Sequence, residues 1–360
     1  MMIATTLDAR IQKRKAQGLL RTLQSPAGLI DLTSNDYFGF GKRSHAAEKD
    51  REQCPGATGS RLLTGNTPYY EQLEEQIARF HRAESCLIYN SGYTANLGLI
   101  SALGTKDTTF LFDLEIHASM IDGMRLSDAK SLPFRHNDLE SLEGRLKKAA
   151  APVFVLVESV YSISGDLAPL RAIASLCTQY GAGLIIDEAH ATGVYGPKGE
   201  GLVVQLGLEL LSFARVHTFS KALGAHGACV AGSRQLKEYL INFSRALIYT
   251  TALPPIALAQ IESSYEMLKK ESGVHQMRLN DLIAYFCRKA SICGTQSPIQ
   301  PLFISGIEKI RALAKKLQTR GFDVRAMVPP TTARRKECLR IVLHSFNQKN
   351  EIDRFIEALS

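Results

Sequence analysis

The residues best suited to chemistry in this sequence are a lysine, two histidines and an acid. Lys221 stands in "HTFSKALG", among side chains that are mostly small, apolar or hydroxylic rather than charged. Asp187 and His190 stand in "DEAHATG" directly after the apolar run "GLII", and His117 follows "TTFLFD" in "LEIHASM". An amine in such surroundings suits Schiff-base chemistry. A carboxylate at the end of an apolar run is costly to bury unless it has a partner.

Each of these residues also has an ordinary structural explanation. Lys221 taken alone is compatible with a surface lysine at the start of a helix, and Asp187 with a helix N-cap. A lone histidine such as His117 is more often a structural residue with satisfied hydrogen bonds. Whether these groups do chemistry therefore depends on whether the fold brings them together.

Apolar runs that alternate with helical periodicity predict an α/β fold between about residues 84 and 235. Segments such as 138–150 and 168–182 have apolar residues at helical spacing. The apolar runs predict buried strands at 85–90, 108–113, 152–158, 183–188, 214–219 and 227–233. This alternation indicates a mostly parallel sheet with helices on both faces. In such sheets ligands bind beyond the carboxyl ends of the strands, which is where the residues above are found.

The rest of the chain predicts an N-terminal arm and a second domain. The first residues predict a short amphipathic helix, and a long helix runs from Pro254-Pro255 to about Arg288. A smaller α+β unit with a final helix at 348–359 follows it. We therefore expect an N-terminal helix and arm over 1–35, a large cofactor-binding domain over 36–250 and a small C-terminal domain over 251–360.

Composition and charge exclude several classes of protein. The 360 residues are 45% apolar and 22% charged, which is typical of a globular protein and excludes a disordered or collagen-like chain. The net charge of +8 is spread along the chain, so nucleic acid is not an expected partner, whereas small polyanionic substrates are compatible with it. No run is long and apolar enough for a membrane span or a secretory signal. The seven cysteines have no metal-ligand spacing, which indicates reduced thiols, a cytoplasmic location and no metal site.

The combination of groups favours pyridoxal phosphate over other chemistries. The chain has no GxGxxG, Walker A or GxSxG motif. Pyridoxal phosphate needs a lysine for its Schiff base, a carboxylate facing its pyridine nitrogen and an anchored phosphate. "NSGYTANLG" places Gly92 at a predicted helix start, where backbone N–H groups and the helix dipole favour a phosphate, although a simple turn explains this segment equally.

The chain resembles the α-oxoamine synthase family of fold-type I pyridoxal phosphate enzymes over nearly its whole length. The resemblance is carried, in order, by "SNDYFGF", "GATGSRLLTGN", "NSGYTANLG", "IHASMIDGMRLS", "DEAHATGVYGPKGEG", "HTFSKALGAHG", "YTTALPP" and "CLRIVLHS". It implies a fold-type I aminotransferase-like architecture, in which a large domain with a mostly parallel sheet is followed by a smaller α+β domain. It also implies a homodimer whose active site lies at the interface.

The resemblance assigns roles to individual residues. Lys221 would bind the cofactor and move the substrate α-proton, Asp187 would pair with the pyridine nitrogen, and His117 would stack on the ring. His190 would hydrogen-bond the phenolic oxygen of the cofactor. The further cofactor contacts that it implies are Gly92, Tyr93, Ser162 and Thr218, with Thr250 or Thr251 reaching the phosphate of the other subunit's cofactor. The implied substrate contacts are Asn35 and Arg340 for the amino-acid carboxylate, and Arg21 and Thr331 for the acyl group.

Within the family, "DEAHATG" and "HNDLESLE" are most similar to members that condense L-alanine with a pimeloyl thioester in biotin synthesis, releasing the thiol carrier and CO2. Glycine-using members tend to have cysteine in place of Ala189. Two alternatives stay open: condensation of glycine with a short acyl-CoA, and a catalytically silent partner subunit. Two residues depart from the family pattern, Ser164 where many relatives have aspartate and Ser220 where glycine is commoner.

Overall fold

The computed structural model describes residues 2–25, 28–43, 56–291 and 294–359. Its chain divides into two units. The large unit comprises Asn35–Ser162 and Asp166–Arg278, and the small unit comprises Met1–Ser34, Ile163–Gly165 and Leu279–Ser360. The division after Arg278 falls inside helix α10 (Pro255–Ala290), whereas the sequence-based boundary at 250/251 precedes that helix.

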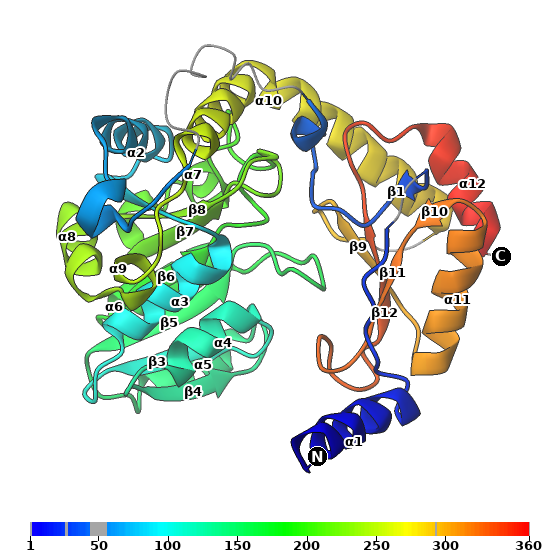
Figure 1. Cartoon of the computed structure of the whole chain (residues 1–360), viewed down its shortest axis with the longest axis horizontal. Coiled ribbons are helices and arrows are strands. Elements are labelled where there is room, and N and C mark those ends of the chain that lie inside the picture. The colour runs from blue at the N-terminus through cyan, green and yellow to red at the C-terminus, as the bar shows by residue number, and fades with distance from the viewer. Residues whose placement is uncertain (1, 26–27, 44–55, 292–293, 360) are drawn as a thin grey trace. The chain divides into compact units, whose positions relative to one another are not determined.

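The apolar runs of the large unit form a seven-stranded sheet in the order β2-β8-β7-β6-β5-β3-β4 (Figure 1). Its strands are β2 (Ser85–Tyr89), β3 (Thr109–Asp113), β4 (Lys130–Phe134), β5 (Val153–Glu158), β6 (Gly183–Asp187), β7 (Ala214–Thr218) and β8 (Ala228–Gly232). Strands β4, β3, β5, β6 and β7 pair in parallel, and β8 is antiparallel to both β7 and β2. The predicted mostly parallel sheet is therefore confirmed, with one antiparallel strand and the additional edge strand β4.

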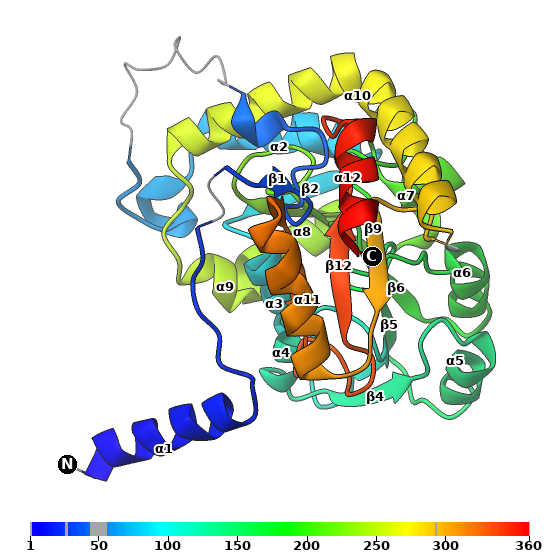
Figure 2. The same ribbon diagram turned by 90° about the vertical axis from the view of Figure 1, so that its right-hand side faces the viewer.

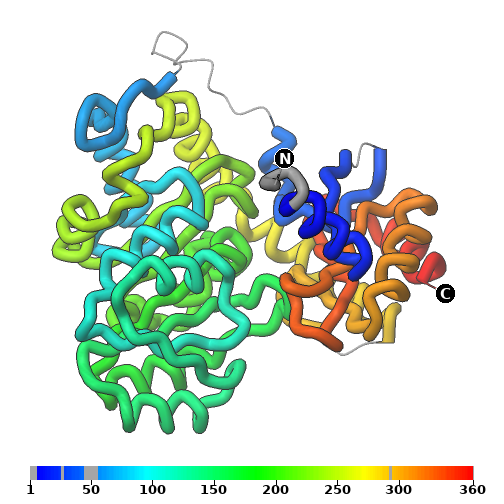
Figure 3. Tube along the Cα trace, turned by 60° about the horizontal axis from the view of Figure 1, so that its bottom comes forward, coloured from blue at the N-terminus to red at the C-terminus, as the bar shows by residue number. Residues whose placement is uncertain are grey.

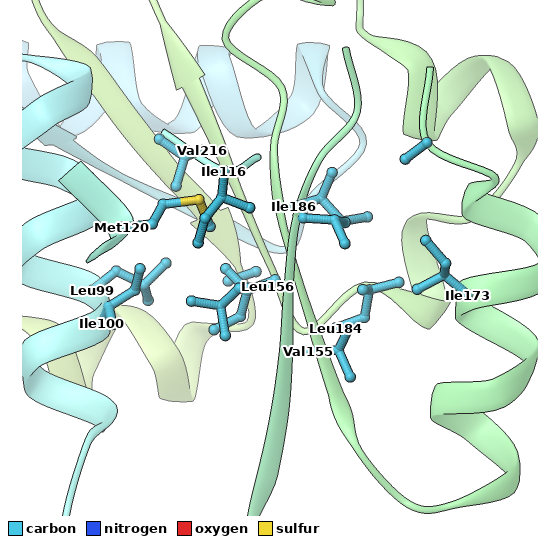
Figure 4. Packing of buried hydrophobic residues seen from close by; sticks show 14 of the residues in the cluster. Leu99, Ile100, Ile116, Met120, Val155, Leu156, Ile173, Leu184, Ile186 and Val216 are labelled. Carbon is cyan, nitrogen blue, oxygen red and sulfur yellow. The ribbon is translucent and has the colours of Figure 1, made fainter. Parts of the chain in front are cut away.

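Helices cover both faces of this sheet. They are α2 (Pro68–Phe80), α3 (Gly92–Leu103), α4 (Ala118–Arg125), α5 (Leu139–Leu146), α6 (Leu170–Gln179), α7 (Leu202–Leu206), α8 (Arg234–Phe243) and α9 (Arg245–Ile248). Figure 4 shows Leu99 of α3 on one side of the central strands and Ile173 of α6 on the other. Both side chains are almost completely buried, as is Leu156 of β5 between them. Because strands buried on both faces expose no polar side, they read as continuous apolar runs in the sequence.

The small unit is built around a short antiparallel sheet in the order β11-β12-β9 (Figure 2). Its strands are β9 (Ile299–Phe303), β11 (Arg325–Met327) and β12 (Cys338–Val342), and a second small sheet pairs β1 (Ile30–Asp31) with β10 (Phe322–Asp323) in parallel. Helix α11 (Ile307–Thr319) packs on β11 and β12, and α12 (Lys349–Leu359) packs on α11. The predicted N-terminal helix is α1 (Met2–Ala16), in which the apolar residues Leu7 and Ile11 are exposed.

The composition predicts reduced thiols and no membrane-spanning helix. Five of the seven cysteines are free thiols, four of them buried, whereas Cys54 and Cys293 lie outside the described residues. Among the helices described here, none combines the length and apolarity that a membrane span needs.

Candidate active site

The predicted catalytic residues of the large unit gather at one edge of its sheet, where the parallel strands end. Glu158 closes β5, Asp187 closes β6 and Thr218 closes β7, and Glu158 pairs with Asp187 in the register of these strands. His117 follows β3 and caps helix α4. The expected position of the site, beyond the carboxyl ends of the strands, thus follows directly from the parallel topology.

Asp187 is a buried carboxylate held on both oxygens. Its exposed fraction is 6%, its Oδ2 accepts a hydrogen bond from Asn96 Nδ2 at 2.7 Å, and its Oδ1 accepts one from the Ala189 N–H at 2.8 Å. These two donors compensate the cost of burying an ionised group. They also fix the direction of the carboxylate. Asn96 lies on α3 and was not among the residues predicted from the sequence.

His117 is linked to the same network through Ser119. The Ser119 N–H donates to His117 Nδ1 at 3.2 Å, the Ser119 hydroxyl lies 2.7 Å from the same nitrogen, and Asn96 Nδ2 donates to that hydroxyl at 3.0 Å. Burial lowers the pKa of His117, an effect that the positive charge of Lys221 reinforces and the negative charge of Asp187 opposes. The result is a neutral imidazole whose Nδ1 accepts, with its orientation fixed by the first turn of α4.

Lys221 lies in the connection between β7 and β8, and its carbonyl accepts a hydrogen bond from the Gly224 N–H at 2.9 Å. The lysine is therefore in a turn of a β-hairpin rather than at the start of a helix. Its side chain is half-buried, and its charge acts on both His117 and Glu158. This places the amine within electrostatic range of His117 and Glu158.

His190 is buried and has an aromatic partner that the sequence did not reveal. The Tyr37 hydroxyl lies 2.6 Å from His190 Nδ1, and Tyr37 itself is fully buried. The contact spans 153 residues of chain. The contact fixes the orientation of the His190 ring.

A candidate phosphate-binding turn, which we call the cradle, lies at the N-terminus of α3 and comprises residues 91–94. Ser91 and Thr94 form a capping box, in which each side chain accepts from the other residue's N–H at 3.2 and 3.0 Å. The N–H groups of Gly92 and Tyr93 are then those that can face an anion. A Cβ added to Gly92 would lie 3.5 Å from Thr218 Cβ and Oγ1, so the loop passes close to the end of β7. Thr218 Oγ1 in turn lies 3.1 Å from Ser220 Oγ.

Tyr93 is exposed and lies edge-on to His117, with 6.5 Å between ring centroids. Its hydroxyl donates to Asp122.

Ser162 donates its N–H to Glu158 Oε2 at 3.0 Å. Burial raises the pKa of Glu158 well above its usual range, and the charge of Asp187 adds to the rise. Glu158 is thus a buried carboxyl with a raised pKa that holds the Ser162 loop, and the sequence did not predict it.

Thr250 and Thr251 lie beside the cradle of their own chain. Asn90, which precedes the α3 loop, donates from Nδ2 to Thr250 Oγ1 at 3.2 Å and to the Thr251 carbonyl at 3.0 Å. Asn90 therefore ties this segment to the end of β2.

The predicted substrate-binding residues are divided between the units. Asn35 belongs to the large unit, whereas Arg340 lies in β12 of the small unit and is 7% exposed. Arg21 and Thr331, which are 310 residues apart, meet in the small unit, where Arg21 Nη2 donates to Thr331 Oγ1 at 3.1 Å. The structure thus brings together the two residues that were expected to contact the acyl group.

The residues present fit pyridoxal phosphate. Asp187 offers a buried, oriented carboxylate for a pyridinium N–H, and the α3 N-terminus with Thr218 offers donors for a phosphate. Lys221 offers the amine, and the neutral His117 offers an aromatic face.

Comparison with known proteins agrees with this geometry. Residues 27–359 match the family described as aminotransferase class I and II. The chain is 39% identical to 8-amino-7-oxononanoate synthase of Emericella nidulans, covering 93% of this chain and 89% of that protein. It is 34% identical to 8-amino-7-oxononanoate synthase 2 of Bacillus subtilis, covering 99% and 97%.

Solved structures show the same fold. Serine palmitoyltransferase of Sphingomonas wittichii superposes with a TM-score of 0.90 at 27% identity, covering 98% of this chain and 95% of that one. 8-Amino-7-oxononanoate synthase of Francisella tularensis superposes with a TM-score of 0.81 at 29% identity, covering 92% and 96%. A serine palmitoyltransferase of S. paucimobilis with a similar fold has been solved with bound PLP.

The chain therefore belongs to the aminotransferase class I and II family, as an α-oxoamine synthase of fold type I. It is a pyridoxal phosphate-dependent enzyme of the acyltransferase type.

Proposed function

We propose that this enzyme condenses L-alanine with a pimeloyl thioester to give 8-amino-7-oxononanoate, the free thiol carrier and CO2, as a step of biotin synthesis. The observation that carries the proposal is the likeness to 8-amino-7-oxononanoate synthases at 34–39% identity over nearly the full chain. The site geometry supports the reaction class, because the oriented Asp187 and the amine of Lys221 lie at neighbouring strand ends.

When bound, pyridoxal phosphate supplies an electron sink that makes the α-carbon of the amino acid acidic. Asp187 would face the pyridine nitrogen and keep its proton in place, because Asn96 and the Ala189 N–H fix the direction of the carboxylate. Lys221 Nζ takes the α-proton from alanine and returns a proton to the product. With the cofactor bound, His117 would lie against its ring, and His190 would hydrogen-bond its phenolic oxygen; Ser119 and Tyr37 fix the orientations of these two histidines.

The proposed substrate contacts are the four residues that the family resemblance implies. Arg340 and Asn35 bind the alanine carboxylate, a role that suits a guanidinium fork. Arg21 and Thr331 contact the acyl group, and the hydrogen bond between them holds the two side chains together. In the net reaction the alanine α-carbon bonds to the thioester carbonyl carbon, the thiolate leaves and takes a proton, and the alanine carboxylate departs as CO2.

We also propose a cytoplasmic homodimer. In it, Thr250 or Thr251 reaches the phosphate of the partner's cofactor. The support in this chain is the exposure of Tyr249 and Thr251 on either side of the half-buried Thr250, which lies beside Asn90 at the N-terminus of α3.

Substrate choice is the point at which relatives of this fold differ. The alternative within the reaction class is glycine with acetyl-CoA, and the fold likeness to serine palmitoyltransferases adds serine with a long acyl-CoA as a further pairing to test. Ala189 favours alanine on the family pattern. A catalytically silent partner subunit would lack turnover with every pairing.

The test is the rate of thiol release by the purified, cofactor-loaded protein with three substrate pairs. We expect L-alanine with pimeloyl-CoA to exceed both glycine with acetyl-CoA and L-serine with palmitoyl-CoA in kcat/KM by at least about tenfold. Faster release with either other pair would replace the proposed substrates. Absence of release with all three would contradict the proposal.

A further inference from the structure

A buried threonine joins the ends of the two strands that carry Asp187 and Thr218. The Thr192 hydroxyl donates to the Glu188 carbonyl at 2.8 Å, and the same oxygen lies 2.9 Å from His217 Nδ1. Glu188 directly follows Asp187 at the end of β6, and His217 directly precedes the last residue of β7. We call the contact between Thr192 and His217 the strand-end brace. Figure 1 shows β6 and β7 as neighbours in the sheet, and Figure 3 shows their part of the chain in green.

The proton positions in the strand-end brace follow from the groups around it. A threonine hydroxyl has one proton, and Thr192 gives it to a carbonyl. His217 Nδ1 therefore carries the proton that it donates to the Thr192 oxygen. The opposite tautomer would bury an N–H at Nε2, an atom with no hydrogen-bond partner among the residues that the structure describes. Burial, reinforced by the neighbouring His81 and Arg215, lowers the pKa of His217 well below its usual range, so the ring is neutral.

A second histidine supports the strand-end brace. His81 stacks on His217, with 3.7 Å between ring centroids and 21° between ring planes. The Nδ1–H of His81 donates to the Glu200 carbonyl at 2.8 Å, and its Nε2 accepts from the Tyr265 hydroxyl at 2.8 Å. Burial lowers the pKa of His81 to about 3, so this ring is neutral too. Thr192 and both histidines are at most 1% exposed, so bulk water does not compete for their hydrogen bonds.

The strand-end brace adds a side-chain contact where the backbone pairing of β6 and β7 stops. Asp187 and Val216 are the last pair of these two strands, and the Glu188 N–H donates to the Val216 carbonyl at 2.8 Å. Thr218 lies two residues beyond that pair. The brace fixes the intervening residue, His217, to the end of β6. It therefore limits how far Thr218 can move from Asp187.

We propose that Thr192 and His217 are positioning residues, which set the spacing between Asp187 and Thr218 so that one cofactor molecule engages both. Pyridoxal phosphate carries its pyridine nitrogen and its phosphate on one flat ring, so the distance between these two groups is nearly fixed. A ligand that engages two contacts at once gains affinity only when their spacing matches its own. The inference rests on the cofactor contacts expected of Asp187 and Thr218, and it adds the two residues that control the distance between them.

The test compares the whole cofactor with its separate parts. Thr192→Val keeps the shape of the side chain and removes the hydroxyl. Ser264→Ala is the matched control, because the buried Ser264 hydroxyl also donates to the carbonyl four residues earlier, that of Gln260, at 2.8 Å. The full-length protein, freed of cofactor, is titrated with pyridoxal 5′-phosphate, with pyridoxal and with inorganic phosphate.

The three ligands should respond differently to the loss of the brace. We expect Thr192→Val to raise the Kd for pyridoxal 5′-phosphate at least about fivefold, which corresponds to one buried hydrogen bond. Its Kd values for pyridoxal and for phosphate should equal those of the wild type, because each part engages only one end of the site. Ser264→Ala should match the wild type with all three ligands.

Variants of His217 test the other half of the strand-end brace. His217→Phe keeps a ring against His81 but removes the donor, so it should weaken binding of pyridoxal 5′-phosphate as Thr192→Val does. The double variant should bind no more weakly than either single one, because both changes remove the same hydrogen bond. His217→Asn brings an amide N–H close to the position of Nδ1, and it should recover most of the affinity that His217→Phe loses.

The outcome that supports the inference is a loss confined to the whole cofactor and recovered by His217→Asn. An equal rise of Kd for all three ligands in Thr192→Val would mean that the brace only maintains the fold, and an unchanged Kd for pyridoxal 5′-phosphate would mean that the spacing does not depend on it. Either result overturns the inference. Since none of these titrations requires turnover, a failure of the proposed substrates leaves the inference standing.

Discussion

Asn96 Nδ2 donates a 2.7 Å hydrogen bond to Asp187 Oδ2 between two side chains that are each at least 94% buried. The two residues come from different elements, helix α3 and strand β6, and are 91 positions apart. The same amide nitrogen donates to Ser119, which holds His117. One asparagine thus orients both the acid and the histidine that are expected to contact the cofactor ring.

Asn96→Ala should weaken cofactor binding without unfolding the protein. A hydrogen bond to a charged group contributes about 1.5–3 kcal/mol, so the Kd for pyridoxal phosphate should rise about 10- to 100-fold. The measurement is a fluorescence or absorption titration of the stripped protein with the cofactor. Ser101→Ala is the control, because Ser101 lies on the same helix and its hydroxyl donates to the Leu97 carbonyl of that helix. Equal affinities of wild type and Asn96→Ala would show that Asn96 does not orient Asp187.

Ser220→Gly should loosen the phosphate end of the cofactor. Ser220 Oγ lies 3.1 Å from Thr218 Oγ1, so this chain places two hydroxyls where the commoner family pattern has one. Loss of one neutral donor should raise the cofactor Kd about two- to tenfold. Thr218→Val is the comparison, and it should have the larger effect because Thr218 is buried at the strand end. A Ser220→Gly protein that retains the cofactor as well as the wild type would assign Ser220 no part in phosphate binding.

His136→Gln should reduce stability in a pH-dependent way. His136 Nδ1 lies 2.9 Å from Asp113 Oδ1, and His136 Nε2 lies 2.8 Å from Asp166 Oδ2. Burial alone would lower the pKa of His136, but its hydrogen bonds to Asp113 and Asp166 raise that pKa to about 10. A raised folded-state pKa means that the stabilisation is complete below about pH 6.5 and is lost as the pH rises through about 10.

Urea unfolding of wild type and variant at pH 6 and pH 10.5 measures this effect. The difference in unfolding free energy should be about 2 kcal/mol at the lower pH and close to zero at the higher one, with allowance for the partial exposure of the ring. The same difference at both values would mean that the charge of His136 has no part in holding Asp113 and Asp166 together.

Most of the sheet could be predicted because its strands are buried on both faces. The six runs that were recognised are mostly apolar, whereas β4 reads "KSLPF", with polar residues at its start and a proline near its end. That composition is tolerated because β4 is an edge strand. Strand direction is not encoded in periodicity, so the antiparallel β8 and the hairpin turn that carries Lys221 became visible only in the structure.

Sequence reasoning identified Lys221 and Asp187 of the candidate site but missed Asn96, Tyr37 and Glu158. Lys221 and Asp187 stand out in the sequence because a charged side chain next to an apolar run is costly to bury without a partner. Asn96 and Tyr37 do not, since their partners are 91 and 153 residues away and neither residue is unusual in its own segment. A polar side chain on the buried face of α3 was the one local signal that pointed to Asn96.

The proposed reaction is tested most directly by following the carboxyl carbon of alanine. The cofactor-loaded protein is incubated with L-[1-13C]alanine and pimeloyl-CoA, and CO2, free thiol and amino ketone are quantified by mass spectrometry and thiol titration. We predict one labelled CO2 for each thiol released, unlabelled 8-amino-7-oxononanoate as the product, and no product from Lys221→Ala. A labelled product, thiol release without labelled CO2, or the same product from Lys221→Ala would contradict the account.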